Sequence, residues 1–132
     1  NDGRIMAPYT VEELRDGDGN VIETHDPELW RQPISAASAA TMREGMVGVV
    51  ENGTASSLQV PGLTVGGKTG TAQLGTDPPS SHAWMIAWAG PEGGEPEIAV
   101  AVLVEAQPGV SETTGNTAAG PIARAIIEAA IT

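Results

Sequence analysis

Three extended runs joined by short connections constrain the fold of this 132-residue chain more than any other feature. They span Leu63 to Gln73, Ala83 to Gly90 and Ile98 to Val104. The connection PEGGEPE, residues 91–97, is too short for the crossover that parallel strands need, so the last two runs must pair antiparallel. The third run is apolar at every position, which is typical of a strand inside a sheet. We therefore predict a three-stranded antiparallel meander.

A helix is predicted at residues 36–51, ahead of these runs. Ser35 can cap its N-terminus, and Gly53 is suited to the left-handed conformation that often follows a helix. The apolar residues of this segment recur at helical spacing and are expected to face the core: Ala39, Met42, Met46 and Val49 or Val50.

A second helix is predicted near the C-terminus, with Thr117 as its cap. Pro121 lies in its first turns, where proline is tolerated. Ile122, Ile126 and Ala129 share one face of this helix, which gives it an apolar side.

The N-terminal part is predicted to form a hairpin. Residues 7–15 and 20–24 flank the sequence DGDG, and Asp-Gly between two extended runs is typical of a hairpin turn. Residues 25–33 contain two prolines and are expected to be irregular. The whole pattern indicates an α+β fold, in which an N-terminal hairpin and covering helices accompany the meander.

Charge and composition exclude several classes of partner. The net charge of −11 argues against nucleic acid or anionic lipid, since both require a basic surface. Cysteine is absent, which excludes disulfides and thiolate metal sites and is compatible with an exported protein. His25 and His82 are far apart in the sequence, with no third ligand at metal spacing, so neither a metal nor a cofactor is expected. Trp84 and Trp88 share one face of their strand and are expected to pack in the core.

The only lysine, Lys68, lies in a sequence that fits two different sites. Residues 62–69 match the phosphate-loop pattern G-x-x-x-x-G-K-[ST], which works only where a helix begins at the Lys-Thr pair. Gly70, Gly75 and Pro78 prevent a helix there, so this match is attributed to chance.

An extended conformation suits the same residues better. In a strand, Lys68, Gly70 and Ala72 face one side, while the side chains of the other three residues face the opposite side: Thr69, Thr71 and Gln73. Gly66, Gly67 and Gly70 let the backbone of a ligand approach closely, so a peptide carboxylate could meet an ammonium group, hydroxyls and backbone N–H groups together. The residues alone are equally consistent with an ordinary glycine-rich edge strand that carries a solubilising lysine.

The longer context resembles the C-terminal part of class B penicillin-binding proteins, most closely the actinobacterial penicillin-binding protein A type. The resemblance runs from about Gly3 to the C-terminus and rests on three motifs: Lys-Thr-Gly-Thr-Ala-Gln at 68–73, Glu-Asn-Gly-Thr-Ala at 51–55 and His-Ala-Trp at 82–84. It implies the fold shared by these transpeptidases and the serine β-lactamases. It also implies a D,D-transpeptidase that cross-links peptidoglycan stem peptides and is acylated by β-lactams.

The resemblance also implies roles for individual residues. Lys68, Thr69 and Thr71 would contact the C-terminal carboxylate of the stem peptide or its mimic in penicillin, with Gly70 and Gln73 lining the same strand. The backbone N–H of Thr71 would be one of two donors to the tetrahedral oxyanion, so Lys68 and Thr71 are the predicted catalytic residues.

The family's nucleophile motif is absent. Ser-x-x-Lys would require serine three residues before the only lysine, where Val65 stands, and no serine is followed two positions later by asparagine. We therefore expect residues 1–132 to be the C-terminal fragment of a transpeptidase domain, inactive alone, with its remainder and a membrane anchor upstream and the domain outside the cytoplasm. Without the earlier strand that borders it in the family, residues 98–104 would form an exposed edge and pair with another copy.

Two alternatives stay open at the level of the sequence. One is a non-catalytic module that binds peptide or penicillin at the Lys68 strand without chemistry. The other is part of a serine β-lactamase or penicillin sensor, since these proteins share Lys-Thr-Gly and differ in residues upstream.

Overall fold

The computed structural model describes residues 1–107 and 113–131 and contains the predicted mixture of helices and antiparallel strands. The chain divides into two compact units, Asn1–Met42 and Arg43–Thr132. Within the described residues, none of the helices is both long and apolar enough to cross a lipid bilayer.

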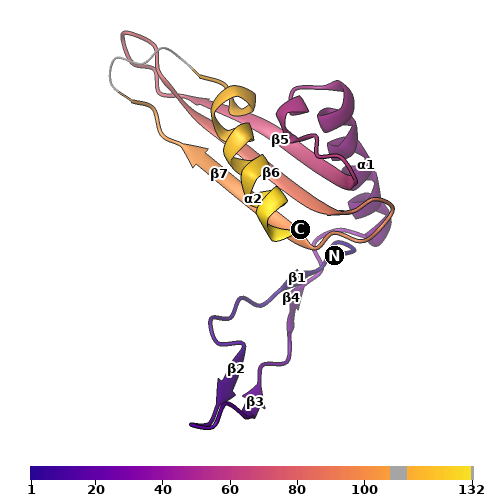
Figure 1. Cartoon of the computed structure of the whole chain (residues 1–132). Coiled ribbons are helices and arrows are strands. Elements are labelled where there is room, and N and C mark those ends of the chain that lie inside the picture. Colours follow the sequence, from indigo (N-terminus) through magenta and orange to yellow (C-terminus); the bar gives the residue numbers. More distant parts are fainter. Residues whose placement is uncertain (108–112, 132) are drawn as a thin grey trace. The chain divides into compact units, whose positions relative to one another are not determined.

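The first unit consists of two small antiparallel ribbons (Figure 1). Strand β2 (Glu13–Arg15) pairs with β3 (Val21–Thr24), which confirms the hairpin. Strand β1 (Ile5–Met6) pairs with β4 (Leu29–Arg31), so the prediction of an irregular segment at residues 25–33 is wrong in part. The cause is a pairing across more than twenty residues, which the local proline pattern does not reveal.

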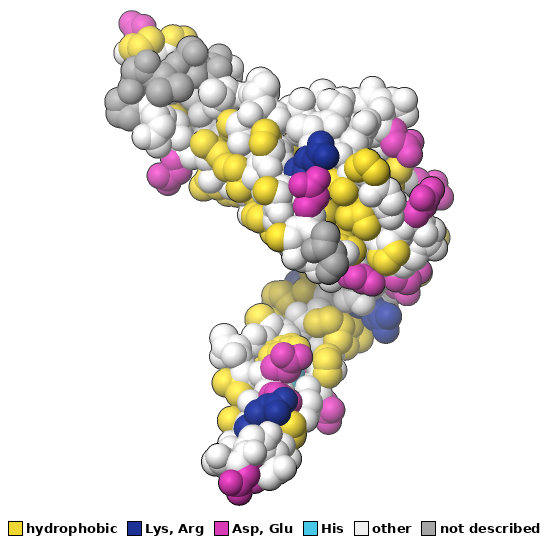
Figure 2. All heavy atoms as spheres, viewed as in Figure 1, with side chains coloured by type: hydrophobic (Ala, Val, Ile, Leu, Met, Phe, Trp, Pro, Cys, Tyr) yellow, Lys and Arg dark blue, Asp and Glu magenta, His cyan; other side chains and the backbone are white. Residues whose placement is uncertain are grey.

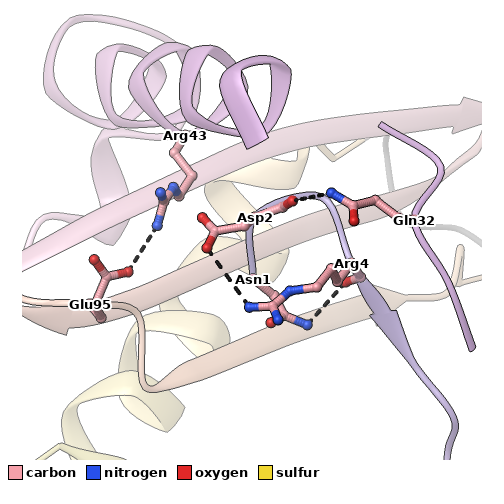
Figure 3. Close-up of polar contacts among 6 residues, drawn as sticks. All are labelled: Asn1, Asp2, Arg4, Gln32, Arg43 and Glu95. Atoms are coloured by element: carbon pink, nitrogen blue, oxygen red, sulfur yellow. Dashed lines mark hydrogen bonds and ion pairs between the residues drawn. The ribbon is translucent and has the colours of Figure 1, made fainter. Parts of the chain in front are cut away.

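The hairpin turn is built around the carboxylate of Asp16. It accepts hydrogen bonds from Asn20 Nδ2 at 3.0 Å and from the backbone N–H groups of Asn20 and Asp18 at 2.9 Å each. These donors, the Asn20 side chain first, lower the pKa of Asp16 because they stabilise its ionised form. Beside β1, Gln32 Nε2 donates to the carbonyl oxygen of Asp2 at 3.2 Å (Figure 3).

Helix α1 (Ala36–Asn52) matches its predicted bounds closely. The backbone N–H of Ser38 donates to Ser35 Oγ at 3.1 Å, which confirms the N-terminal cap. Val50 is buried as expected, but Met42 is 61% exposed, so the predicted core face is wrong at that position.

Gly53 does not have the left-handed conformation predicted for it. Its N–H donates to the carbonyl oxygen of Val49 at 3.1 Å, and a Cβ added to it would lie 2.9 Å from that same oxygen. Glycine is needed here because the chain stays close to the last turn of α1, and not because of a positive φ.

The second unit contains the predicted meander: β5 (Leu63–Gln73), β6 (Ser81–Pro91) and β7 (Ile98–Val104), hydrogen-bonded in that order. It also contains the 3₁₀ turn η1 (Ser56–Leu58), the π-helical turn η2 (Gly115–Ala119), helix α2 (Gly120–Ala130) and the part of α1 from Arg43 onward. Helix α2 lies across one face of the sheet (Figure 1). The core between them consists of buried apolar residues from each element, among them Leu58, Val65, Met85, Val102 and Ile127.

Helix α2 differs from its prediction at both the cap and the buried face. The N–H of Thr117 donates to Thr114 Oγ1, so Thr114 caps η2 and Thr117 lies inside it, while the N-cap position of α2 is Ala119. Ala123 and Ile127 face the core, whereas Ile122 and Ile126 are 46% and 41% exposed. Figure 2 shows hydrophobic side chains at the surface over this helix. The small side chain of Ala123 lets the helix approach the sheet closely, which a simple count of large apolar residues overlooks.

The sheet face opposite α2 is apolar and open. Trp84 and Ile86 of β6 are 39% and 48% exposed, and their neighbour Leu103 on β7 is exposed as well. The expectation that Trp84 packs in the core is therefore wrong for the described residues, while Trp88 is half-buried. Strand β7 has a neighbour on one side only among the described strands, which confirms the exposed edge expected there.

Candidate active-site strand

The strand that carries Lys68 has one free edge, because β5 is hydrogen-bonded only to β6 among the described strands. Backbone hydrogen bonds at both ends of the β5–β6 pair show which residues of β5 bond to β6. Glu92 N donates to the Gly62 oxygen at 3.2 Å, and Leu74 N donates to the Ser80 oxygen at 3.0 Å. The register between these ends is unbroken. Since hydrogen-bonded positions alternate in an antiparallel pair, even-numbered residues of β5 bond to β6. Odd-numbered residues, Thr69 and Thr71 among them, direct their N–H and C=O groups to the free edge.

Lys68 also reaches this edge. Its side chain starts from the face that carries Ile86, its partner on β6, and its ammonium group donates to the carbonyl oxygen of Thr69 at 2.7 Å. The ammonium group therefore lies beside the same row of backbone groups that Thr69 and Thr71 present. Lys68 and Thr71 are exposed, and Thr69 is half-buried.

The structure brings the predicted site residues together on one strand. Lys68, Thr69, Gly70, Thr71 and Gln73 are consecutive or alternate positions of β5, which ends at Gln73. An ammonium group, hydroxyl groups and edge N–H groups side by side can bind a carboxylate and a second developing negative charge.

Gly66 and Gly67 of β5 have a structural reason that differs from the expected one. A Cβ added to Gly66 would overlap the indole of Trp88, and one added to Gly67 would overlap Leu58 Cδ1. These positions are glycine because neighbouring side chains of the same chain occupy the space. The expectation of close ligand approach is not needed to explain them.

Thr54 and Gly115 contact β5 from the side of the sheet that carries α2, and the sequence alone predicted no role for either residue. Thr54 Oγ1 lies 2.9 Å from Thr69 Oγ1. At Gly115, the first residue of η2, an added Cβ would overlap the carbonyl oxygen of Trp84 and lie 3.1 Å from Thr69 Cβ. Thr54 belongs to the Glu-Asn-Gly-Thr-Ala motif at residues 51–55, on which the resemblance partly rests, whereas no sequence pattern around Gly115 indicated a role.

The two histidines have structural contacts. His82 Nδ1 accepts the N–H of Ala106 at 3.0 Å, which ties the start of β6 to the residues after β7. His25 lies against Tyr9 in the first unit. The structure contains no cluster of three potential metal ligands within residues 1–107 and 113–131.

A cavity of about 640 Å³ lies at the beginning of β5. Thr64, Trp88 and Pro96 line it, and an ion pair between Arg43 Nη1 and Glu95 Oε2 at 3.0 Å borders it (Figure 3). Thr64 precedes Lys68 by four residues, which is roughly 13 Å along a strand. Lys68 does not line this cavity.

Comparisons with known proteins agree on one family. The family described as penicillin binding protein transpeptidase domain matches residues 1–128. Peptidoglycan D,D-transpeptidase PbpA of Mycolicibacterium smegmatis is 43% identical over 99% of this chain and 26% of that protein. PbpA of Mycobacterium tuberculosis H37Rv is 41% identical over 99% of this chain and 26% of that protein.

Solved structures give the same result. The ceftriaxone acyl-enzyme complex of penicillin-binding protein A from M. tuberculosis has a TM-score of 0.80 at 40% identity, covering 100% of this chain and 29% of that one. The penicillin G acyl-enzyme complex of the same protein has a TM-score of 0.74 at 41% identity, covering 98% and 28%. The chain spans about a quarter, 26%, of the length of the curated relatives that it matches.

Proposed function

This chain belongs to the penicillin-binding protein transpeptidase domain family, and from that membership we propose that it is the C-terminal part of a peptidoglycan D,D-transpeptidase domain. In this proposal its task is to bind the substrate carboxylate and to stabilise the oxyanion along β5. The observation that carries the proposal is the free edge of β5, where the N–H groups of Thr69 and Thr71 lie beside the Lys68 ammonium group.

The edge suits both charges of an acyl-transfer substrate. Lys68 and the hydroxyl groups of Thr69 and Thr71 bind the carboxylate of the stem peptide, with Gly70 and Gln73 lining the strand beside it. The N–H of Thr71 points away from β6 and donates to the oxyanion as the carbonyl becomes tetrahedral. A donor fixed on a strand needs no reorganisation as that charge develops. Acyl-enzyme complexes of the M. tuberculosis relative with ceftriaxone and penicillin G support β-lactams as mimics of this substrate.

The nucleophile and the general base come from a preceding part of the same domain in this proposal, because residues 1–132 contain no Ser-x-x-Lys. That part packs on the open face formed by Trp84, Ile86 and Leu103 and pairs with β7. The domain works outside the cytoplasm, with its membrane anchor upstream. A second candidate is a non-catalytic module that binds peptide or penicillin at the same edge, because the Lys68 ammonium group and the edge N–H groups of β5 suit binding without chemistry as well.

Fluorescent penicillin distinguishes these two candidates. We expect the complete protein to be labelled covalently and the label to map, after proteolysis, to a Ser-x-x-Lys serine outside residues 1–132. The isolated chain should remain unlabelled. If the complete reading frame lacks such a serine, or if the complete protein binds penicillin only reversibly, the protein is a non-catalytic binding module.

The free edge of β7 leads to a separate expectation for the isolated chain. An apolar strand with unpaired backbone groups is a template for pairing with another strand. We expect the chain to self-associate at high concentration, measured by size-exclusion chromatography with light scattering. Ala101→Lys places a charge on the exposed face of this strand and should shift the chain toward monomer, whereas Ala125→Lys on the exposed side of α2 should not. A monomer for the unsubstituted chain at every concentration would contradict this expectation.

A further inference from the structure

We propose that Thr54 is a positioning residue, which directs the hydroxyl proton of Thr69 toward the substrate carboxylate. The inference rests on the proposed function, because it assigns a second residue to the carboxylate site on β5. Nothing in the order of the sequence places these two threonines together. They meet because the turn after α1 returns to the strand, where Thr54 Oγ1 lies 2.9 Å from Thr69 Oγ1.

The turn that carries Thr54 is held rigidly on both sides of it. The N–H groups of Gly53 and Ala55 both donate to the carbonyl oxygen of Val49, each at 3.1 Å. Ala55 is completely buried, and its carbonyl oxygen accepts the N–H of Leu58 at 3.0 Å, where η1 continues the chain. The side chain of Thr54 is thus presented to β5 from a fixed backbone, as a positioning role requires.

Thr69 is fixed from its other side as well. Gly115 at the start of η2 lies so close that a Cβ added there would be 3.1 Å from Thr69 Cβ and 3.2 Å from the N of Gly70. The Thr69 side chain therefore lies between η2 and Thr54. The hydroxyl groups of Thr54 and Thr69 are each other's only hydrogen-bonding partners within the described residues.

The count of protons gives the direction of the hydrogen bond. A threonine hydroxyl has one proton to donate and two lone pairs, and an ionised carboxylate can only accept. When a carboxylate binds at Thr69, the Thr69 proton must point to it. Thr54 must then donate to Thr69, which gives a chain from Thr54 through Thr69 to the carboxylate. A hydroxyl group that accepts one hydrogen bond donates a stronger second one, because the two bonds polarise each other.

Removal of the Thr54 hydroxyl should therefore weaken recognition of the carboxylate without changing the acyl-transfer groups. In the complete transpeptidase, we expect Thr54→Val to reduce the rate constant of penicillin acylation by roughly 5- to 10-fold, which is within the range for the loss of one hydrogen bond between neutral groups. Thr54→Ser keeps the hydroxyl and should restore the rate to within about twofold. Thr41→Val serves as the matched control, because Thr41 donates only to the Ala37 carbonyl oxygen within α1.

Two further measurements separate this role from a merely structural one. Penicillin methyl ester has no ionised carboxylate, so Thr54→Val should leave its acylation rate unchanged. In a Thr69→Val background, adding Thr54→Val should cause no further loss for penicillin, since Thr54 acts through Thr69. Equal slowing of penicillin and its ester, or additive losses in the double variant, would overturn the proposal and leave Thr54 as a structural link between α1 and β5.

The same variants also show whether the proposed function itself has failed. Slower acylation in Thr69→Val with no change in Thr54→Val refutes only the role of Thr54. No change in either Thr69→Val or Lys68→Ala refutes the carboxylate site on β5, and the inference fails with it. Because Thr54 is exposed, Thr54→Val should fold, and Thr54→Ala provides a second variant without the hydroxyl.

Discussion

Replacing Lys68 with alanine in the complete protein should slow penicillin acylation by about two to three orders of magnitude, the usual effect of removing one preorganised group that stabilises charge at an acyl-transfer site. The ammonium group lies at the free edge of β5, beside the edge N–H groups of Thr69 and Thr71. It is the only lysine in the chain, and Asp77 is the only other charged residue between Asn52 and Pro91. No neighbouring cation can therefore replace it along this strand.

The fold should tolerate the loss of Lys68. The side chain is exposed, and its one hydrogen bond in the structure goes to the adjacent residue, Thr69. An exposed substitution of this kind changes the free energy of unfolding by less than about 0.5 kcal/mol. Acylation rates measured with fluorescent penicillin, together with thermal melting, separate a loss of chemistry from a loss of structure.

Arg124→Ala is the matched control for charge. Arg124 lies on α2, where it forms an ion pair with Glu128 at 2.9 Å, and its removal changes the net charge by the same amount. We expect its acylation rate to stay within about twofold of the unsubstituted protein, because the removal of a surface charge contributes little. If Lys68→Ala and Arg124→Ala slow acylation equally, the effect comes from the change in net charge, and the position of Lys68 on β5 has no particular role.

The meander was predictable because its signals are local. Short polar connections require antiparallel neighbours, and the apolar run 98–104 indicates a strand wherever it occurs. The candidate site residues follow one another along a single strand, so their common place on β5 was predictable for the same reason. The α1 cap at Ser35 likewise depends on residues three positions apart.

The missed features all depend on contacts between distant residues. Strand β4 exists through its pairing with β1, and the buried face of α2 is decided by the small Ala123 against the sheet. Thr54 and Gly115 act on β5 across fifteen and more than forty residues of sequence. No periodicity or turn signal carries such information, so these residues appear only once the backbone is in place.

Gly115→Ala should be the most damaging single-methyl change in the part of the chain that supports the site. The added Cβ would overlap the carbonyl oxygen of Trp84, a backbone atom that cannot rotate away. It would also press on Thr69 and Gly70, which belong to the proposed carboxylate site. Either η2 or β5 must therefore move, and an overpacked methyl group of this kind costs about 1–3 kcal/mol of folding free energy. We expect denaturant unfolding to show that loss and penicillin acylation to fall at least tenfold, because small displacements of positioning groups are costly in catalysis.

Gly45→Ala makes the same chemical change where space is open. Gly45 lies inside α1, and a Cβ added there meets nothing within 4 Å, so the variant should gain about 0.5–1 kcal/mol from the higher helix propensity of alanine. A Gly115→Ala protein with unchanged stability and full acylation would show that η2 does not support β5. If stability falls while the acylation rate per folded molecule is unchanged, Gly115 supports the fold but not the geometry of Thr69. We expect Gly115→Ala to lower both stability and the acylation rate, because Gly115 lies directly against the backbone of β5 and β6.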